Sequence, residues 1–169
     1  MSTRDYHILI QTIEEYHSRL NTYTESKFLE KINPEVWSPA EVYAHIIFAN
    51  RLTVQNMQKA VEGKATEDNG KLPWKVRLLL FTGRFPSGRK VPDVVAKRTP
   101  QFLSIADARE ATESLRAELI NIWKSHALWS PSQKLKHPVL GLLNNKQWIT
   151  FMKIHSIHHI KQLDRIRNF

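Results

Sequence analysis

Residues 147–163 read QWITFMKIHSIHHIKQL, and this stretch indicates the fold more clearly than any other in the chain. Its apolar residues recur at intervals of three and four, which is the pattern of an α-helix with one buried face. On a helical wheel with His155 at zero, His159 lies at about +40° and Trp148 at about +20°. Both histidines therefore lie in the middle of the face expected to be buried, and we predict a helix over residues 145–167.

A second helix has a clear start at Ser38. With Pro39 at the first helical position and Glu41 at the third, the serine and the glutamate can each accept a hydrogen bond from the other's backbone amide. We expect this helix to end near Gly63, because glycine is common at helix C-termini. His45 follows the cap by seven residues and falls on the apolar face, so it also points to the core.

Two further long helices complete the pattern. Residues 4–24 form one amphipathic stretch, and Asp107 is positioned to cap the other. Residues 64–103 separate the second and third helices and contain repeated Gly and Pro, with a short helix predicted over residues 74–81. No strand-like alternation persists, so we predict an all-α protein: a four-helix bundle with a long crossover between helices 2 and 3. Its length suits a single domain over residues 1–169.

Composition narrows the chemistry open to this chain. It contains no cysteine, which excludes disulfides, thiolate metal ligands and a cysteine nucleophile, so any metal would be held by histidine or carboxylate. The N-terminus lacks an apolar run of the signal-peptide type, and no purely apolar run, such as residues 78–81, approaches membrane-spanning length. We therefore expect a cytoplasmic protein with no membrane partner.

The net charge of +9 is concentrated in part of the chain. Residues 71–100 carry eight Lys or Arg against Asp93 alone, a local balance of +7. Such a segment can bind nucleic acid or another polyanion, or can simply be a solvated surface. No nucleic-acid-binding motif accompanies the charge, so we expect no specific nucleic-acid partner. A non-enzymatic helical module that binds a polyanion through residues 71–100 remains the alternative to an enzyme.

Three histidines on two apolar helix faces suggest a metal site. A buried imidazole needs a partner, and one transition-metal ion would satisfy His45, His155 and His159 together. Residues four apart on a helix have Cβ atoms about 6 Å apart, so the later pair can bind one ion from adjacent turns. His45 reaches a similar depth if the two helices run antiparallel. Three protein ligands leave a coordination position open, as in catalytic zinc sites.

Three segments of the sequence carry a family resemblance. They are WSPAEVYAH at residues 37–45, HPVLGLL at residues 137–143 and the stretch at residues 147–163. In its tryptophan–serine helix start, the histidine seven residues after that serine and the late histidine pair, the chain resembles the DinB/YfiT-like family, whose members are regarded as metal-dependent enzymes. The resemblance is closest over the second and last helices. The N-terminal helix and the basic crossover match only in length and place.

This resemblance has implications for fold, cofactor and activity. It implies a four-helix bundle with a long link between helices 2 and 3, a three-histidine site for zinc, nickel or another divalent ion, and often a homodimer. Some family members resemble thiol S-transferases, which join a low-molecular-weight thiol to an electrophile. Others are described as metal-dependent hydrolases.

An open metal site would suit either reaction on a small-molecule substrate. The ion could activate a water for hydrolysis or hold a thiol as thiolate for S-transfer. Hydrolases of this kind generally have a carboxylate base beside the metal, whereas Ser156 follows His155 here. Glu41, one turn before His45, is the only evident catalytic candidate, and it is at least as well suited to a capping box with Ser38. These features slightly favour transfer and leave hydrolysis open.

Neighbouring polar residues on the last helix are predicted to have different roles. His158 lies at about −60° on the same wheel, toward Lys161 and Arg165, so we predict that His159 rather than His158 binds the metal. Gln162 and Asn56 point the same way as the ligands. They could hydrogen-bond the second nitrogen of a ligand or a substrate, or be polar residues at the edge of the packed core.

Large aromatic residues outside the predicted core suggest self-association. Trp37, Trp74 and Trp129 fall at predicted helix ends or in loops. Because tryptophan is favoured at protein interfaces, we expect a homodimer.

Overall fold

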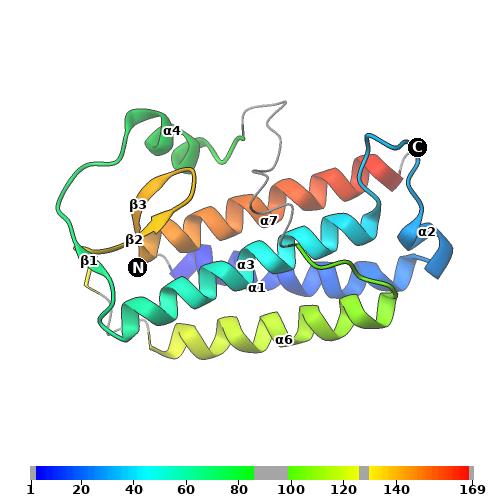
Figure 1. Cartoon of the computed structure of the whole chain (residues 1–169), viewed down its shortest axis with the longest axis horizontal. Coiled ribbons are helices and arrows are strands. Elements are labelled where there is room, and N and C mark those ends of the chain that lie inside the picture. The colour runs from blue at the N-terminus through cyan, green and yellow to red at the C-terminus, as the bar shows by residue number, and fades with distance from the viewer. Residues whose placement is uncertain (1–2, 86–98, 126–129, 168–169) are drawn as a thin grey trace.

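The computed structural model describes residues 3–85, 99–125 and 130–167. Four long helices lie side by side along the longest axis of the molecule (Figure 1): α1 (Thr3–Arg19), α3 (Pro39–Val61), α6 (Ile105–Lys124) and α7 (Asn145–Arg167). The connections contain two short helices, α2 (Glu25–Leu29) and α4 (Trp74–Thr82), and the 3-10 turn η1 (Leu20–Thr22). The predicted four-helix bundle is confirmed.

The order of the helices in space places α3 beside α7. Helix α1 packs against α6 and α7, and α3 packs against the same two helices. The connection between α3 and α6 returns the chain to the end of the bundle where α3 began, so α6 runs parallel to α3 and α7 runs opposite to both (Figure 1). Because α3 and α7 are adjacent and antiparallel, His45 near the start of α3 can lie at the same depth as His155 in the middle of α7 and His159 one turn later.

Helix α3 begins at the predicted cap. The Ser38 hydroxyl accepts a hydrogen bond from the Glu41 backbone amide at 3.2 Å, and the Glu41 carboxylate accepts one from the Ser38 amide at 2.8 Å. The helix ends at Val61, and Gly63 follows with a φ of 73° in the left-handed region that glycine adopts easily. The local sequence therefore sets both ends of the helix that carries His45.

Helix α6 begins earlier than predicted, because Asp107 is not its cap. Ser104 caps the helix, and its hydroxyl accepts a hydrogen bond from the Asp107 amide at 3.0 Å. The Asp107 carboxylate instead accepts a hydrogen bond from the Leu103 amide at 3.3 Å. Ser104 and Asp107 thus have the three-residue spacing of a helix start, and this pair forms in preference to Asp107 and Glu110.

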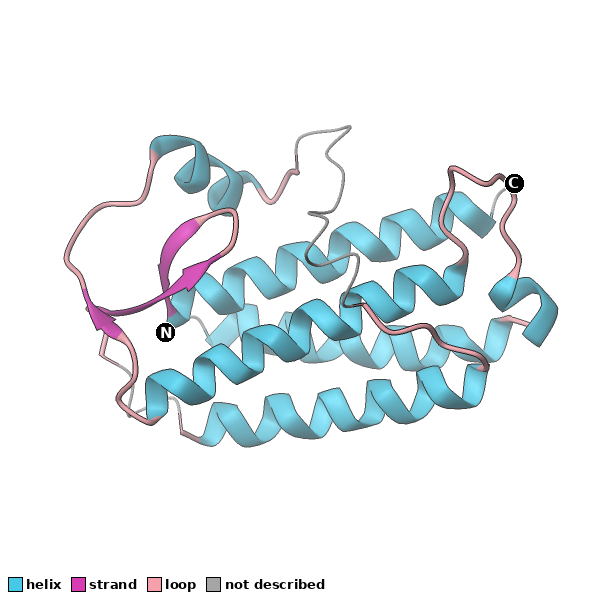
Figure 2. Ribbon diagram, in the orientation of Figure 1, coloured by secondary structure: helices cyan, strands magenta, loops and turns pink. Residues whose placement is uncertain are grey.

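A small antiparallel sheet lies at the end of the bundle where α7 begins (Figure 2). Its strands are β1 (Thr66–Glu67), β2 (Gln133–His137) and β3 (Gly141–Asn144), in the order β1-β2-β3. Leu135 pairs with Leu143 across β2 and β3. The sequence did not predict this sheet, because strands of two to five residues are too short for an alternating pattern to stand out.

Three buried hydrogen bonds tie α1, α3 and α7 together. The Tyr43 hydroxyl donates to the Tyr16 carbonyl and the Tyr16 hydroxyl donates to the Ser156 carbonyl, both at 2.8 Å. The Asn50 side-chain amide donates to the Ser156 hydroxyl at 3.1 Å. Asn50 and Ser156 are 1% and 0% exposed, so each would be costly to leave unpaired. These contacts set the spacing of α3 and α7 next to their histidines.

Among the described residues, no helix is both long enough and apolar enough to cross a membrane.

Candidate metal centre

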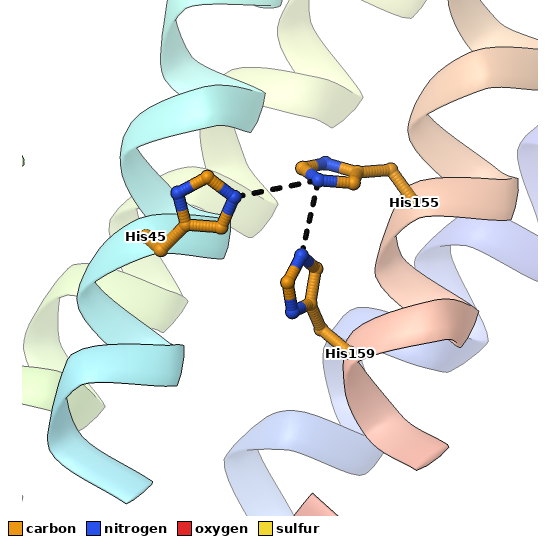
Figure 3. Close-up of side chains that lie close together, drawn as sticks. All are labelled: His45, His155 and His159. Atoms are coloured by element: carbon orange, nitrogen blue, oxygen red, sulfur yellow. Dashed lines mark hydrogen bonds between the residues drawn. The ribbon is translucent and has the colours of Figure 1, made fainter. Parts of the chain in front are cut away.

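Three histidine side chains converge between α3 and α7 (Figure 3). The Nε2 atom of His155 lies 3.4 Å from Nε2 of His45 and 3.1 Å from Nε2 of His159. One ligand nitrogen from each ring lies within 4.8 Å of the other two. Two nitrogens bound to one zinc ion at a tetrahedral angle would be about 3.3 Å apart, given Zn–N distances of about 2.0–2.1 Å. The spacing of the three nitrogens therefore suits a single ion.

The protonation state of the rings also suits a metal. Burial lowers the pKa of His45 to about 4 and that of His159 to about 3, with a smaller contribution from neighbouring histidines. The pKa of His155 is lowered well below its usual value, again mainly by burial. All three rings are thus neutral at pH 7, so each has one nitrogen lone pair that can bind a cation.

The contacts between the three rings leave their hydrogen-bonding capacity unsatisfied. A neutral imidazole nitrogen carries either one proton or one lone pair, so Nε2 of His155 cannot form full hydrogen bonds to both neighbours. Nδ1 of His45 and Nδ1 of His155 are buried and have no hydrogen-bond partner within the described ranges. Buried polar groups normally have partners, so this cluster is chemically incomplete. A cation would accept the Nε2 lone pairs that crowd one another here, with the ring protons of His45 and His155 on their Nδ1 atoms.

Gln162 fixes the orientation of one ring. Its side-chain oxygen lies 2.7 Å from Nδ1 of His159. Because an amide oxygen only accepts hydrogen bonds, Nδ1 of His159 carries the proton and Nε2 presents its lone pair to the other two histidines. This is the contact that the sequence suggested for Gln162.

Aromatic side chains enclose the cluster. The Trp37 ring stacks on His159 with 6.3 Å between ring centroids and meets the edge of His45 at 5.1 Å. Phe151 stacks on His155 at 5.2 Å, and Phe85 lies 5.7 Å from the same ring. These contacts limit rotation of the imidazoles and cover part of each ring.

Two of these aromatic neighbours were not predicted. Trp37 was expected at an interface, but the structure places it half-buried against His45 and His159. Its position directly before the helix cap was the available signal, since such residues often pack back on their helix. Phe85 reaches the cluster from the connection after α4, and no local pattern indicates that approach. Trp129 lies outside the described residues.

His158 lies beside the cluster but is not one of its members. Its ring centroid is 5.1 Å from that of His159 and 5.2 Å from that of Phe85. The group of three close ligand atoms comprises His45, His155 and His159 and does not include it. This arrangement agrees with the wheel, which placed His158 on the flank of α7.

Glu41 lies near the cluster with both carboxylate oxygens in use. One oxygen is part of the capping box, and the other accepts a hydrogen bond from the Lys31 ammonium group at 3.1 Å. Glu41 and His45 both line a pocket of about 440 Å³. Its other lining residues include Lys31 and the apolar side chains Leu29, Trp37, Pro100, Phe102 and Leu103. The pocket gives a small molecule room beside His45.

Fold and site together define a four-helix-bundle protein with three converging histidines between two antiparallel helices. A sequence model of the DinB superfamily matches residues 8–163. The chain belongs to the DinB superfamily, which confirms the resemblance seen in its histidine motifs.

Two solved structures share the fold. One is TT2238, described as a four-helix bundle protein, with a TM-score of 0.62, 16% identity and coverage of 96% of this chain and 97% of that one. The other is YfiT from Bacillus subtilis, described as "a probable metal-dependent hydrolase with an unusual four-helix bundle topology". It has a TM-score of 0.64 and 12% identity, with coverage of 99% of this chain and 89% of that one. No match was found among curated proteins.

Proposed function

We propose that this chain is a metal-dependent enzyme acting on a small molecule, with His45, His155 and His159 as the ligands of one divalent cation, zinc or nickel. The observation that carries the proposal is the convergence of three neutral imidazoles, two buried and one half-buried, at a spacing that suits one ion. When bound, such an ion would lower the pKa of a water or thiol at its open position and supply a nucleophile near neutral pH.

The residues around the cluster have distinct roles in this proposal. Gln162 keeps the proton of His159 on Nδ1, and Trp37 and Phe151 hold the rings and exclude water. The pocket beside His45 binds the substrate, with apolar walls and the Lys31 ammonium group at its polar side. A substrate with an apolar body and an anionic or electronegative group would match this lining.

Thiol S-transfer is the reaction that the site supports best. Within the described ranges, no carboxylate joins the histidine group, and both oxygens of Glu41 have partners. The sulfur of a low-molecular-weight thiol would attack an electrophilic carbon and form a C–S bond. With an epoxide, the ring C–O bond breaks and the proton lost by the thiol ends on the oxygen. Such a reaction needs no carboxylate base.

Hydrolysis is the second candidate, and the position of Glu41 favours it. Glu41 lines the same pocket as His45, so separation from Lys31 would leave one carboxylate oxygen free to accept a proton from an attacking water. YfiT, which has the same fold, is described as a probable metal-dependent hydrolase.

A paired assay tests the proposal. Untagged protein loaded with zinc or nickel is incubated with thiols and electrophiles, with thiol depletion as readout, and separately with ester and amide substrates. We expect thiol depletion that requires both protein and metal and that disappears in His155→Ala but not in the neighbouring variant His158→Ala. Glu41→Gln separates the reactions, because loss of a general base would reduce hydrolysis by about 10²-fold or more. Activity retained in His155→Ala, or no reaction in either panel, would contradict the proposal.

A further inference from the structure

Helix α4 stands outside the four-helix bundle and is apolar on two sides (Figure 1). Val76 and Leu80 face inward and pack against the core. On another side, Trp74, Leu78 and Phe81 follow one another at spacings of four and three residues, so they share a face. They are 67%, 52% and 90% exposed. The apolar face of a helix is normally covered, so the outer face of α4 lacks a partner among the described residues.

Cations surround this apolar face. Lys71, Lys75, Arg77 and Arg84 are all exposed, and residues 71–85 contain no acidic residue. None of the four forms a salt bridge with another described residue. The Lys75 ammonium group lies over the Trp74 ring, 5.6 Å from its centroid. The face therefore combines apolar side chains with positive charge that no carboxylate neutralises.

A polar pocket of about 650 Å³ adjoins the helix. Lys71 and Arg77 line it, together with Lys134, Asp68 and the hydroxyl residues Ser130 and Ser132. The Lys134 ammonium group is already bound, at 2.8 Å from the Asp68 carboxylate and 2.5 Å from the Gly70 carbonyl. Because Asp68 is the only carboxylate in this lining and is paired, Lys71 and Arg77 are left uncompensated. Two such cations beside hydroxyl groups suit a phosphate group.

We propose that α4 docks on an anionic lipid surface. Trp74, Leu78 and Phe81 enter the interfacial region of the bilayer, and the four cations and the adjoining pocket bind lipid phosphates. Tryptophan, phenylalanine and leucine beside Lys and Arg are the usual composition of a helix that lies in a membrane interface. The proposal is independent of the enzymatic one. An anionic lipid surface would be the polyanion that the basic segment at residues 71–100 binds. The expectation of no membrane partner is revised accordingly, because it was based only on the lack of a membrane-spanning segment.

Charge favours lipid over a second copy of the chain as the occupant. A two-fold contact through α4 would bring the same cations of two molecules together, and like charges at an interface oppose association. An anionic surface has the opposite effect, because each nearby Lys or Arg is attracted to it.

Vesicle co-sedimentation of the untagged 169-residue chain tests this proposal. We expect at least tenfold stronger binding to vesicles of phosphatidylcholine with phosphatidylglycerol than to phosphatidylcholine alone, and weaker binding at high salt. The variant W74S/L78S/F81S should lose at least tenfold. The variant K71Q/R77Q should lose about 25-fold, since each of the two cations contributes about fivefold.

A matched control uses exposed apolar residues at the opposite end of the bundle. Leu29, Ile32 and Leu103 are 43%, 48% and 76% exposed, and L29S/I32S/L103S should bind vesicles like the wild type. Circular dichroism and thermal melting check that each variant is folded.

Several results would overturn the proposal. One is equal binding to both vesicle types, and another is full binding by W74S/L78S/F81S, which would leave only non-specific charge attraction. Binding of inorganic phosphate without vesicle binding would show a free-phosphate site. A dimer that W74S/L78S/F81S converts to a monomer, with no vesicle binding, would show that a second copy covers α4.

Discussion

The histidine cluster between α3 and α7 and the outer face of α4 depart in opposite ways from the usual arrangement of a globular protein. The first places polar rings in the core, where His45 and His159 are 5% and 6% exposed. The second places Phe81 at the surface with 90% of its area exposed. A buried polar group and an exposed apolar face both indicate a functional site, because the first needs a polar partner and the second needs an apolar one. In the two proposals, a bound cation satisfies the first region and a lipid surface covers the second.

The largest expected difference between the two regions is in stability. Leu115→Ala removes a side chain that is fully buried in α6 and should lower the free energy of unfolding by about 2–5 kcal/mol. Phe81→Ala should change it by less than about 0.5 kcal/mol, because the side chain is already in water. Urea unfolding of both variants measures this difference. Similar losses in the two variants would show that α4 packs more tightly than its exposure indicates.

Acid should lower the free energy of unfolding through His137, a further histidine with a lowered pKa. His137 packs against Phe151, with its ring centroid 4.6 Å away, and burial lowers its pKa to about 4. The unfolded chain binds this proton near pH 6.5 and the folded chain does not, so stability present above pH 6.5 is lost as the pH falls toward 4. The slope for this residue is about 1.4 kcal/mol per pH unit.

His137→Asn isolates this contribution. Nδ1 of His137 accepts hydrogen bonds from the amides of Val139 and Leu140, both at 3.1 Å, and asparagine also offers an acceptor without titrating. Urea unfolding of metal-free protein between pH 4 and 7 should show one proton fewer taken up on unfolding in the variant. An unchanged pH dependence would mean that His137 is solvated in solution.

Ser156→Ala probes the hydrogen bond that joins α3 to α7. It leaves the buried side-chain amide of Asn50 without its acceptor and should lower stability by about 1–3 kcal/mol. Ser114→Ala is the matched control, because the Ser114 hydroxyl bonds to Glu118 at the surface, and it should change stability by less than about 0.5 kcal/mol. Thermal melting compares the two. Equal losses of stability in the two variants would show that the hydrogen bond from Asn50 to Ser156 does not stabilise the packing of α3 against α7.

The smallest expected effect concerns the orientation of one ligand. Gln162→Ala removes the acceptor of Nδ1 of His159 and should weaken zinc binding by about tenfold without emptying the site. Competition with a chromophoric chelator measures the affinity. Gln58→Ala, which removes an exposed side chain of α3 that bonds to Glu62, should leave it unchanged. A zinc affinity that Gln162→Ala does not alter would show that this hydrogen bond does not orient the ligand.

Local signals in the sequence predicted most of the fold. The capping residues Ser38 and Glu41 set the start of α3, and the periodicity of residues 145–167 gave α7 with the bounds found in the structure. The same periodicity placed His155 and His159 on one buried face. The three histidines could be grouped in advance because each lies on an apolar stripe and the two helices had to share a core.

Features that depend on distant contacts could not be predicted in the same way. The start of α6 was predicted at Asp107, whereas the structure caps this helix at Ser104. The pairing of β1 with β2 joins residues more than sixty positions apart. The approach of Phe85 to His155 likewise depends on how the long connection folds back, which no short-range periodicity records.

Metal content of three proteins tests the central claim most directly. Untagged wild type, His159→Ala and His158→Ala are incubated with zinc or nickel, freed of excess ion and analysed by elemental mass spectrometry. We predict near-stoichiometric metal in the wild type and in His158→Ala, and almost none in His159→Ala, because a site with two imidazoles loses both affinity and geometry. Absence of metal from the wild type, or a site emptied by His158→Ala and kept by His159→Ala, would contradict the account.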